Sequence, residues 1–130
     1  MFANLLDNAI RYTPRGGMID VVLKRDRHDA LVEIIDSGCG IPTAALPHIF
    51  DRFFRAAPLD IEGTGLGLAI AKAIADRNGF HLSIVNRQDA AGAVAQVRIP
   101  ILSEEATSTQ LIAARSKSHL MQRFSVSAEP

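Results

Sequence analysis

The sequence is poor in the features that would place it in several common classes of protein. Among 130 residues it has no tryptophan and one cysteine, Cys39. A single cysteine excludes an internal disulfide framework and fits a reducing compartment. No apolar run reaches the roughly 18–20 residues of a membrane span, because Lys72 interrupts the longest candidate. The N-terminus also lacks the basic start of a signal peptide.

An excess of charge of either sign is also missing. Fourteen basic and fourteen acidic residues cancel, so nothing in the composition indicates binding to nucleic acid or to a membrane surface. We therefore expect no nucleic-acid partner, no direct membrane contact and a cytoplasmic location, with a parent protein that could be anchored to the inner membrane. Apolar residues make up 48% of the chain, which is enough for the core of one domain.

The apolar periodicity predicts an α+β domain over residues 1–101, with helices on one face of a mixed sheet. The predicted elements, in chain order, are helix 2–11, strands 18–25 and 30–35, helices 45–55 and 65–77, and strands 80–86 and 93–99. The helix at 65–77 places Leu66, Ile70, Ala73 and Ile74 on one face.

The composition changes after the last predicted strand. Residues 102–130 are rich in serine, threonine and charge, and they lack the alternation that is typical of a strand. Leu111, Ile112, Arg115 and Leu120 have the spacing of one weak amphipathic helix. We expect a disordered or weakly helical tail.

Gly63, Gly65 and Gly67 stand at alternate positions where the second long helix is predicted to begin. The first amides of a helix have no partner within it and its dipole is positive there, so a helix start favours an anion. The alternative is a flexible loop with an ordinary helix entry. The glycines alone do not decide between the two.

Two further features place polar side chains at element ends. Asn4 and Asn8 are four residues apart and share one face of the first predicted helix. Asp36 follows an apolar strand and precedes a short loop with two glycines. Taken separately, the asparagines also fit an exposed polar stripe and the aspartate an ordinary turn.

Four segments of the chain, in order and spacing, resemble the N, G1, F and G2 boxes of the ATP-binding domain of sensor histidine kinases. They are NLLDNAIRYTP (4–14), DSGCGIP (36–42), IFDRFFR (49–55) and GTGLGLAIAKAIADRNG (63–79). The resemblance covers residues 1–100 and implies a two-layer α/β sandwich of the histidine-kinase ATPase type. It also implies that residues 56–62 form a short lid over ATP.

The resemblance implies ATP and Mg²⁺ as ligands. Asn8 matches the asparagine whose amide oxygen binds Mg²⁺, and Asn4 lies one turn earlier, near the phosphates; these are the expected catalytic residues. Arg11 and Tyr12 match positions that contact phosphate or ribose, and Asp36 matches the aspartate that accepts from the adenine amino group. The other expected nucleotide contacts are Gly38, Gly40 and Ile41 beside the adenine, and Gly63, Thr64, Gly65, Leu66 and Gly67 at the phosphates.

The function implied by the resemblance is that of an ATP-binding catalytic module. It would bind Mg-ATP for phosphoryl transfer to a histidine on another domain, with a response regulator downstream. The family's domain has a further strand and helix before the N box, and an acceptor histidine on a preceding helical hairpin. We therefore expect an N-terminally truncated fragment that is not active alone, with one sheet edge or one core face uncovered.

Two other functions stay open. One is a degenerate nucleotide-binding or interaction module without turnover. The other is a related ATPase or serine kinase, which commonly has a glutamate as general base where this chain has Asn4, an amide that cannot take a proton.

The chain departs from the family pattern at two positions: Phe80 replaces a common second glycine, and Val94 matches a position that often holds a threonine near the adenine. We expect weaker adenine binding as a result.

Overall fold

The computed structural model describes residues 1–25, 28–56, 63–101 and 121–127. Residues 57–62 of the predicted lid, and residues 102–120 and 128–130 of the predicted tail, lie outside this part of the chain. The elements are α1 (Phe2–Tyr12), β1 (Met18–Arg25), β2 (Asp29–Asp36), the short 3-10 helix η1 (Leu46–His48), α2 (Gly67–Arg77), β3 (His81–Asn86), β4 (Ala93–Pro100) and β5 (Met121–Ser127). None of the described helices is long and apolar enough to cross a membrane.

The five described strands form one sheet in the order β3-β4-β2-β1-β5. Every pair of neighbours is antiparallel, so the prediction of a mixed sheet is wrong in this respect. The connection through α2 does lead from β2 to a strand of the same direction, β3. However, β4 lies between these two strands and pairs with both, so no parallel neighbours arise.

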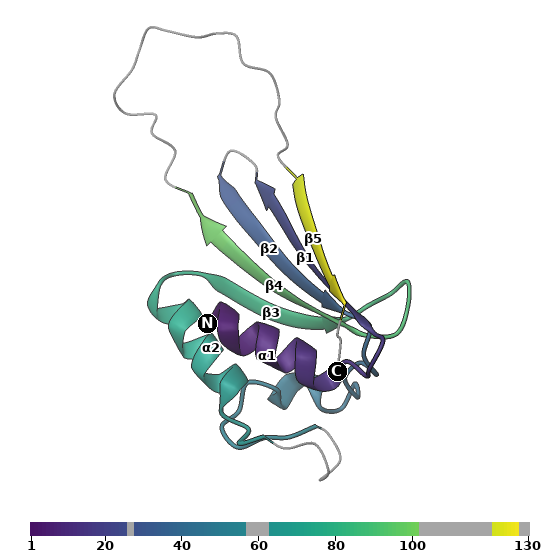
Figure 1. Ribbon diagram of the computed structural model, residues 1–130. Coiled ribbons are helices and arrows are strands. Elements are labelled where there is room, and N and C mark those ends of the chain that lie inside the picture. Colours follow the sequence, from purple (N-terminus) through teal and green to yellow (C-terminus); the bar gives the residue numbers. More distant parts are fainter. Residues whose placement is uncertain (26–27, 57–62, 102–120, 128–130) are drawn as a thin grey trace, which may run out of the picture.

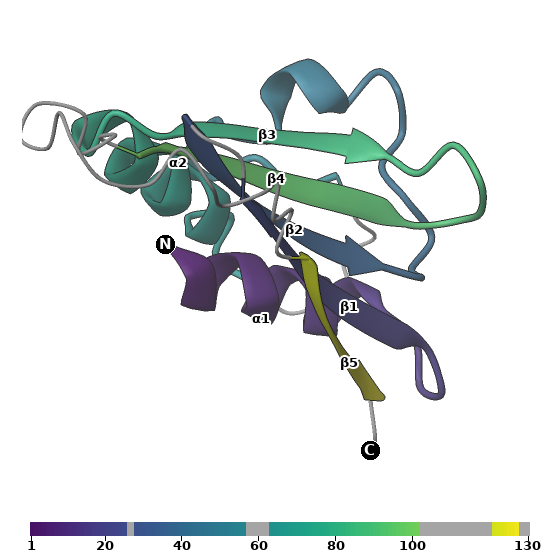
Figure 2. The same ribbon diagram turned by 90° about the horizontal axis from the view of Figure 1, so that it is seen from above.

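The helices α1 and α2 lie side by side on one face of the sheet, as predicted (Figures 1 and 2). α1 contacts β2 and α2 contacts β3, and the core fills the space between the two layers. The buried core residues are Leu5, Ala9, Ile19, Ile34, Ile49, Ala71, Ala75, Leu82, Ile84, Ala93, Ala95 and Val97. The opposite face of the sheet carries no described helix.

The buried face of α2 differs from the predicted one. Ala71 and Ala75 are fully buried, whereas Ile70 is 47% exposed and Ala73 is exposed. Because α2 is apolar almost all round, the apolar pattern does not select one face. The small alanine side chains allow close packing, and they lie on the side that faces the core.

The helix predicted over 45–55 is also wrong, because only η1 is helical there. Phe53 has a φ of 64°, which ends any helix at that position. Its N–H donates to the carbonyl oxygen of Gly65 at 2.9 Å. This segment is therefore tied to the glycine-rich turn before α2.

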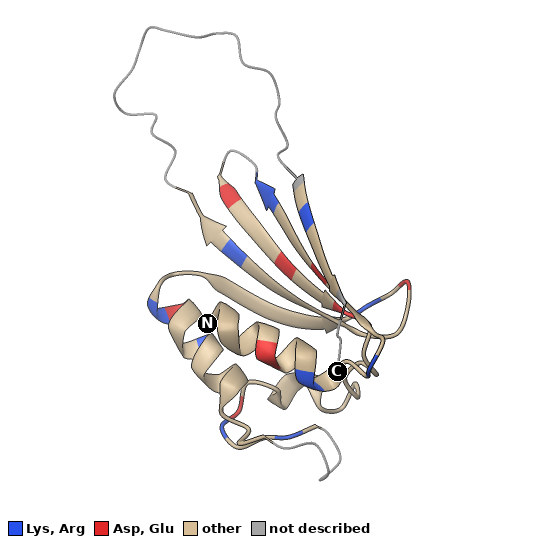
Figure 3. Cartoon of the chain, viewed as in Figure 1, with Lys and Arg blue, Asp and Glu red and all other residues tan. Residues whose placement is uncertain are grey.

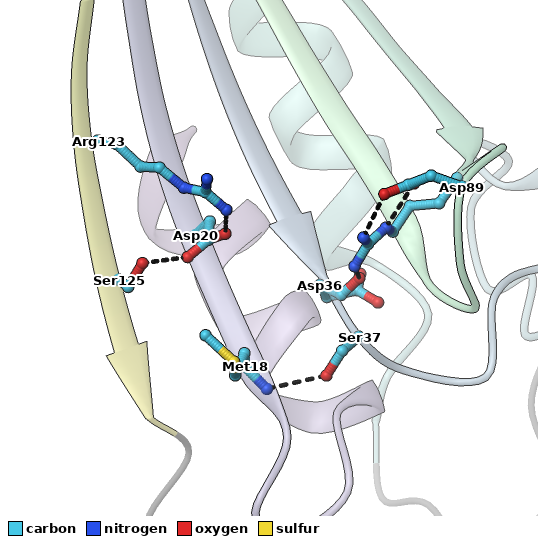
Figure 4. A network of polar contacts seen from close by, with 8 residues as sticks. Met18, Asp20, Asp36, Ser37, Asp89, Arg123 and Ser125 are labelled. Carbon is cyan, nitrogen blue, oxygen red and sulfur yellow. Dashed lines mark hydrogen bonds and ion pairs between the residues drawn. The ribbon is translucent and has the colours of Figure 1, made fainter.

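Part of the predicted tail forms a strand. β5 pairs with β1 and forms the edge of the sheet on that side. Arg123 and Ser125 each donate a hydrogen bond to the carboxylate of Asp20 on β1 (Figure 4). Phe124 and Val126 are opposite Val21 and Ile19, and they remain 60% and 63% exposed. A short polar and apolar alternation in a serine-rich segment was too weak a signal to predict this strand.

Candidate functional site

A cleft of about 1230 Å³ lies between α1, the start of α2 and the loops that follow β2 and β3. All of the predicted site residues line it except Gly38. Those in the cleft are Asn4, Asn8, Arg11, Tyr12, Asp36, Gly40, Ile41, Gly63, Thr64, Gly65, Leu66 and Gly67. Residues from four separate segments of the sequence therefore converge on one concave surface, which is typical of a ligand site.

Gly38 is packed against the end of α1 and is not among the described residues that line the cleft. It is buried, and a Cβ at this position would overlap the carbonyl oxygen of Tyr12 at the end of α1. Its N–H donates to Oδ1 of Asp36 at 2.9 Å. Only glycine allows the loop to pass this close to α1.

Asp36 ends β2 and is only 8% exposed. Its Oδ1 accepts two hydrogen bonds, from the N–H of Gly38 at 2.9 Å and from the N–H of Ala93 at 3.1 Å. Its Oδ2 accepts none from the residues that the structure describes. The carboxylate is thus held rigidly by one oxygen, while the other is left to accept a hydrogen bond from a ligand in the cleft.

The position next to this carboxylate on β4 is Ala93, and the prediction of Val94 is wrong. Ala93 lines the cleft, whereas Val94 pairs with Ile35 and Val85 on the opposite face of the sheet. Successive strand residues point to opposite faces, so a shift of one position reverses the side. Like valine, alanine has no hydroxyl, so the expectation of weaker adenine binding is unchanged.

The start of α2 forms another wall of the cleft. Leu66 is the N-cap residue and provides no side-chain cap, so the first amides of the helix have no partner of that kind. Gly65 precedes it with a φ of 70°, and a Cβ there would lie 2.7 Å from the backbone of Phe53. Uncapped amides and the positive end of the helix dipole favour an anion at this wall.

The side chains of α1 complete the opposite wall. Asn4 and Asn8 are half-buried, and neither amide has a hydrogen bond to another described residue. One turn further on, Arg11 pairs with Asp7 at 2.8 Å, and its guanidinium lies against Gly63 in the glycine-rich turn. Two amides and a cation from α1 therefore border the same space as the start of α2.

Asn86 and Arg87, at the end of β3, also line the cleft and were missed in the sequence. The guanidinium of Arg87 donates to the carboxylate of Asp89 and, at 3.5 Å, to the backbone carbonyl oxygen of Asp36. The hydrogen bond with Asp89, at 2.8 Å, raises the pKa of Arg87 and lowers that of Asp89. The available signal was a polar pair that directly follows the apolar strand LSIV.

The comparisons with known proteins agree with this arrangement. The family model described as histidine kinase-, DNA gyrase B- and HSP90-like ATPase matches residues 1–103. The chain belongs to this family of ATPase domains.

Individual relatives are sensor kinases. The chain is 41% identical, over 75% of its length, to the sensor protein KdpD of Clostridium acetobutylicum, and it spans 11% of that protein. In structure it is similar to the mycobacterial sensor histidine kinase MprB, with a TM-score of 0.67, 34% identity, and coverage of 75% of this chain and 67% of that one. It is also similar to full-length ShkA in complex with AMPPNP, with a TM-score of 0.64, 25% identity, and coverage of 81% of this chain and 21% of that one.

Proposed function

We propose that this chain is the ATP-binding catalytic module of a two-component sensor histidine kinase. It would bind Mg-ATP for transfer of the γ-phosphoryl group to a histidine on another domain. One observation carries the proposal: the carboxylate of Asp36 and the uncapped start of α2 line the same cleft, and one oxygen of Asp36 is left to accept a hydrogen bond. The first suits an adenine amino group and the second suits phosphates.

The side chains of α1 fit the phosphate end of such a ligand. Asn8 would provide an amide oxygen to Mg²⁺, a cation that prefers oxygen ligands and is held jointly by protein and substrate phosphates. When bound, Mg²⁺ neutralises negative charge on the phosphates. In the described part of the chain, no group of three or more His, Cys, Asp or Glu side chains is placed to hold a metal ion. Arg11 and the amides at the start of α2 would orient the same phosphates.

The partners follow from the same proposal. The acceptor histidine would be on a phosphoacceptor domain, in the same parent chain or in a dimer partner, and a response regulator would take the phosphoryl group from it. A module without turnover is less well supported, because the similar proteins are sensor kinases. Hydrolysis with a general base at position 4 is disfavoured, since the amide of Asn4 cannot take a proton.

The proposal is tested by titrating a fluorescent ATP analogue, with Mg²⁺ or with a chelator, into the full chain. We expect binding that depends on Mg²⁺. In Asn8→Ala the gain in affinity from Mg²⁺ should fall by about tenfold, since one direct ligand is lost. Asn8→Asp is the matched control, because it retains an oxygen ligand and should keep the dependence. Equal binding by parent and Asn8→Ala, with or without metal, would remove Asn8 from this role.

A further inference from the structure

The side chain of Asn86 pairs with both backbone groups of one residue in another loop. Its Oδ1 accepts from the N–H of Ile41 at 2.7 Å, and its Nδ2 donates to the carbonyl oxygen of Ile41 at 2.7 Å. The two residues are 45 positions apart in the sequence. The amide of Asn86 thus satisfies a stretch of backbone as a neighbouring strand would.

The loop between β2 and η1 has two anchors, one in each half. In the first half, the N–H of Met18 donates to Oγ of Ser37 at 2.8 Å, and the N–H of Ser37 donates to the carbonyl oxygen of Met18 at 3.0 Å (Figure 4). In the second half, Asn86 holds Ile41. This second anchor lies in the part of the loop that lines the cleft, which is residues 39–42.

We propose that Asn86 is a positioning residue for the base end of the nucleotide site. It fixes Gly40 and Ile41 at a set distance from the carboxylate of Asp36, so that the loop is ordered before the base arrives. Without this pair the loop loses order in the free protein, and ordering it again on binding costs affinity. The inference rests on the proposed function and extends it to a residue outside the four sequence boxes.

This role differs from a purely structural one in what it affects. Asn86 holds the loop beside Asp36, whereas the start of α2 is held by Phe53 and Gly65. If Asn86 has a positioning role, its substitution should therefore lower the affinity only for ligands that contain a nucleobase. The affinity for inorganic tripolyphosphate, which has no nucleobase, should not depend on Asn86. General damage to the fold would lower the affinity for both ligands.

The test is calorimetric titration of the full chain with ATP and with tripolyphosphate, both with Mg²⁺. In Asn86→Ala the affinity for ATP should fall by roughly tenfold, while that for tripolyphosphate stays within about twofold of the parent. Asn78→Ala is the matched control, because Asn78 also donates from Nδ2 to a backbone carbonyl, that of Ile74 at 2.7 Å, away from the cleft. It should change neither affinity.

A second variant keeps the inference testable if Asn86→Ala does not fold. Asn86→Asp retains an acceptor for the N–H of Ile41, but its ionised form cannot donate to the carbonyl oxygen. Its ATP affinity relative to tripolyphosphate should rise again on acidification, as the carboxyl group regains a proton to donate. Unchanged ATP affinity in both variants, or equal losses for the two ligands, would overturn the inference. If the parent binds neither ligand, the proposed function itself fails.

Discussion

Two buried carboxylates on β2 have opposite surroundings. Glu33 and Asp36 are each 8% exposed, and their spacing of three residues places them on opposite faces of the sheet. Both oxygens of Glu33 are used, one by Nζ of Lys24 at 2.7 Å and the other by Nε2 of Gln96 at 2.9 Å. Only one oxygen of Asp36 is used. Incomplete pairing, and not burial, distinguishes the carboxylate of the site from that of the scaffold.

The same contrast extends over the two faces of the sheet. On the open face, burial raises the pKa of Glu33, but the hydrogen bonds from Lys24 and Gln96 outweigh it and the pKa is lowered overall. The hydrogen bond from Arg123, with that from Ser125, likewise lowers the pKa of Asp20. Charges of both signs are interspersed along these strands (Figure 3). On this face both oxygens of Asp20 and of Glu33 accept hydrogen bonds from neighbouring strands, whereas Oδ2 of Asp36 in the cleft accepts none from the described residues.

The largest change in nucleotide affinity is expected from substitution of Asp36. Asp36→Asn should weaken ATP binding by about five- to 150-fold, because a buried hydrogen bond to the adenine amino group is worth roughly 1–3 kcal/mol. The parent should prefer ATP to GTP, since guanine presents a carbonyl acceptor at that place. The variant should narrow this preference, because an amide can donate as well as accept. Competition of ATP and GTP against one fluorescent nucleotide measures both.

Glu33→Gln is the matched control for that substitution. It also converts a buried carboxylate on β2 to an amide, but on the face that lacks the cleft. Its ATP affinity should stay within about twofold of the parent, because distant sites are usually independent. If the parent binds ATP and GTP equally, Asp36 serves only as a turn residue and its role at the adenine fails.

Residues whose chemistry is local could be predicted from the sequence, and those that depend on distant partners could not. Asn8 and Asp36 lie in short motifs at element ends, and both were placed in the cleft. Asn86 was missed because its partner, Ile41, is 45 residues away. The packing of Gly38 against Tyr12 was not predicted, because this close approach depends on how α1 packs.

The same reasoning applies to the fold. The strands from β1 to β4 were predicted by local alternation, within one residue at each end. The antiparallel order depends on where β4 inserts, and the pairing of β5 depends on an edge at the other end of the chain. Neither is encoded within a short window of sequence.

Glu33 should also make the stability of the folded protein depend on pH. The pKa of Glu33 in the folded protein lies below its ordinary value of 4.5. The unfolded chain therefore binds a proton there first, so this stabilising contribution is complete above pH 4.5 and is lost as the pH falls from 4.5 through the lower folded pKa. Melting temperatures measured from about pH 6 down to about pH 3 should fall less steeply in Glu33→Gln than in the parent.

Asp20 provides an internal reference for this measurement. Its pKa is also lowered in the folded protein, so part of the acid sensitivity should remain in Glu33→Gln. Asp20→Asn should remove a separate part, and the double variant should be less sensitive than either single one. Identical pH slopes in the parent and Glu33→Gln would show that folding does not lower the pKa of Glu33.

The smallest effect on nucleotide affinity is expected from removing β5. Deletion of residues 103–130 should leave ATP affinity within about twofold of the parent, because the described residues that line the cleft include none from β5.

The stability of the folded protein should fall in the deletion variant, since β1 loses its pairing with β5 and Asp20 loses the hydrogen bonds from Arg123 and Ser125. The exposed edge of β1 should also increase self-association, which light scattering would detect. Arg123→Ala removes only the ion pair, whose cation is 59% exposed, and should change stability much less than the deletion does. A loss of ATP affinity beyond about fivefold in the deletion variant would show that the tail acts on the cleft. The nucleotide site would then not be independent of β5.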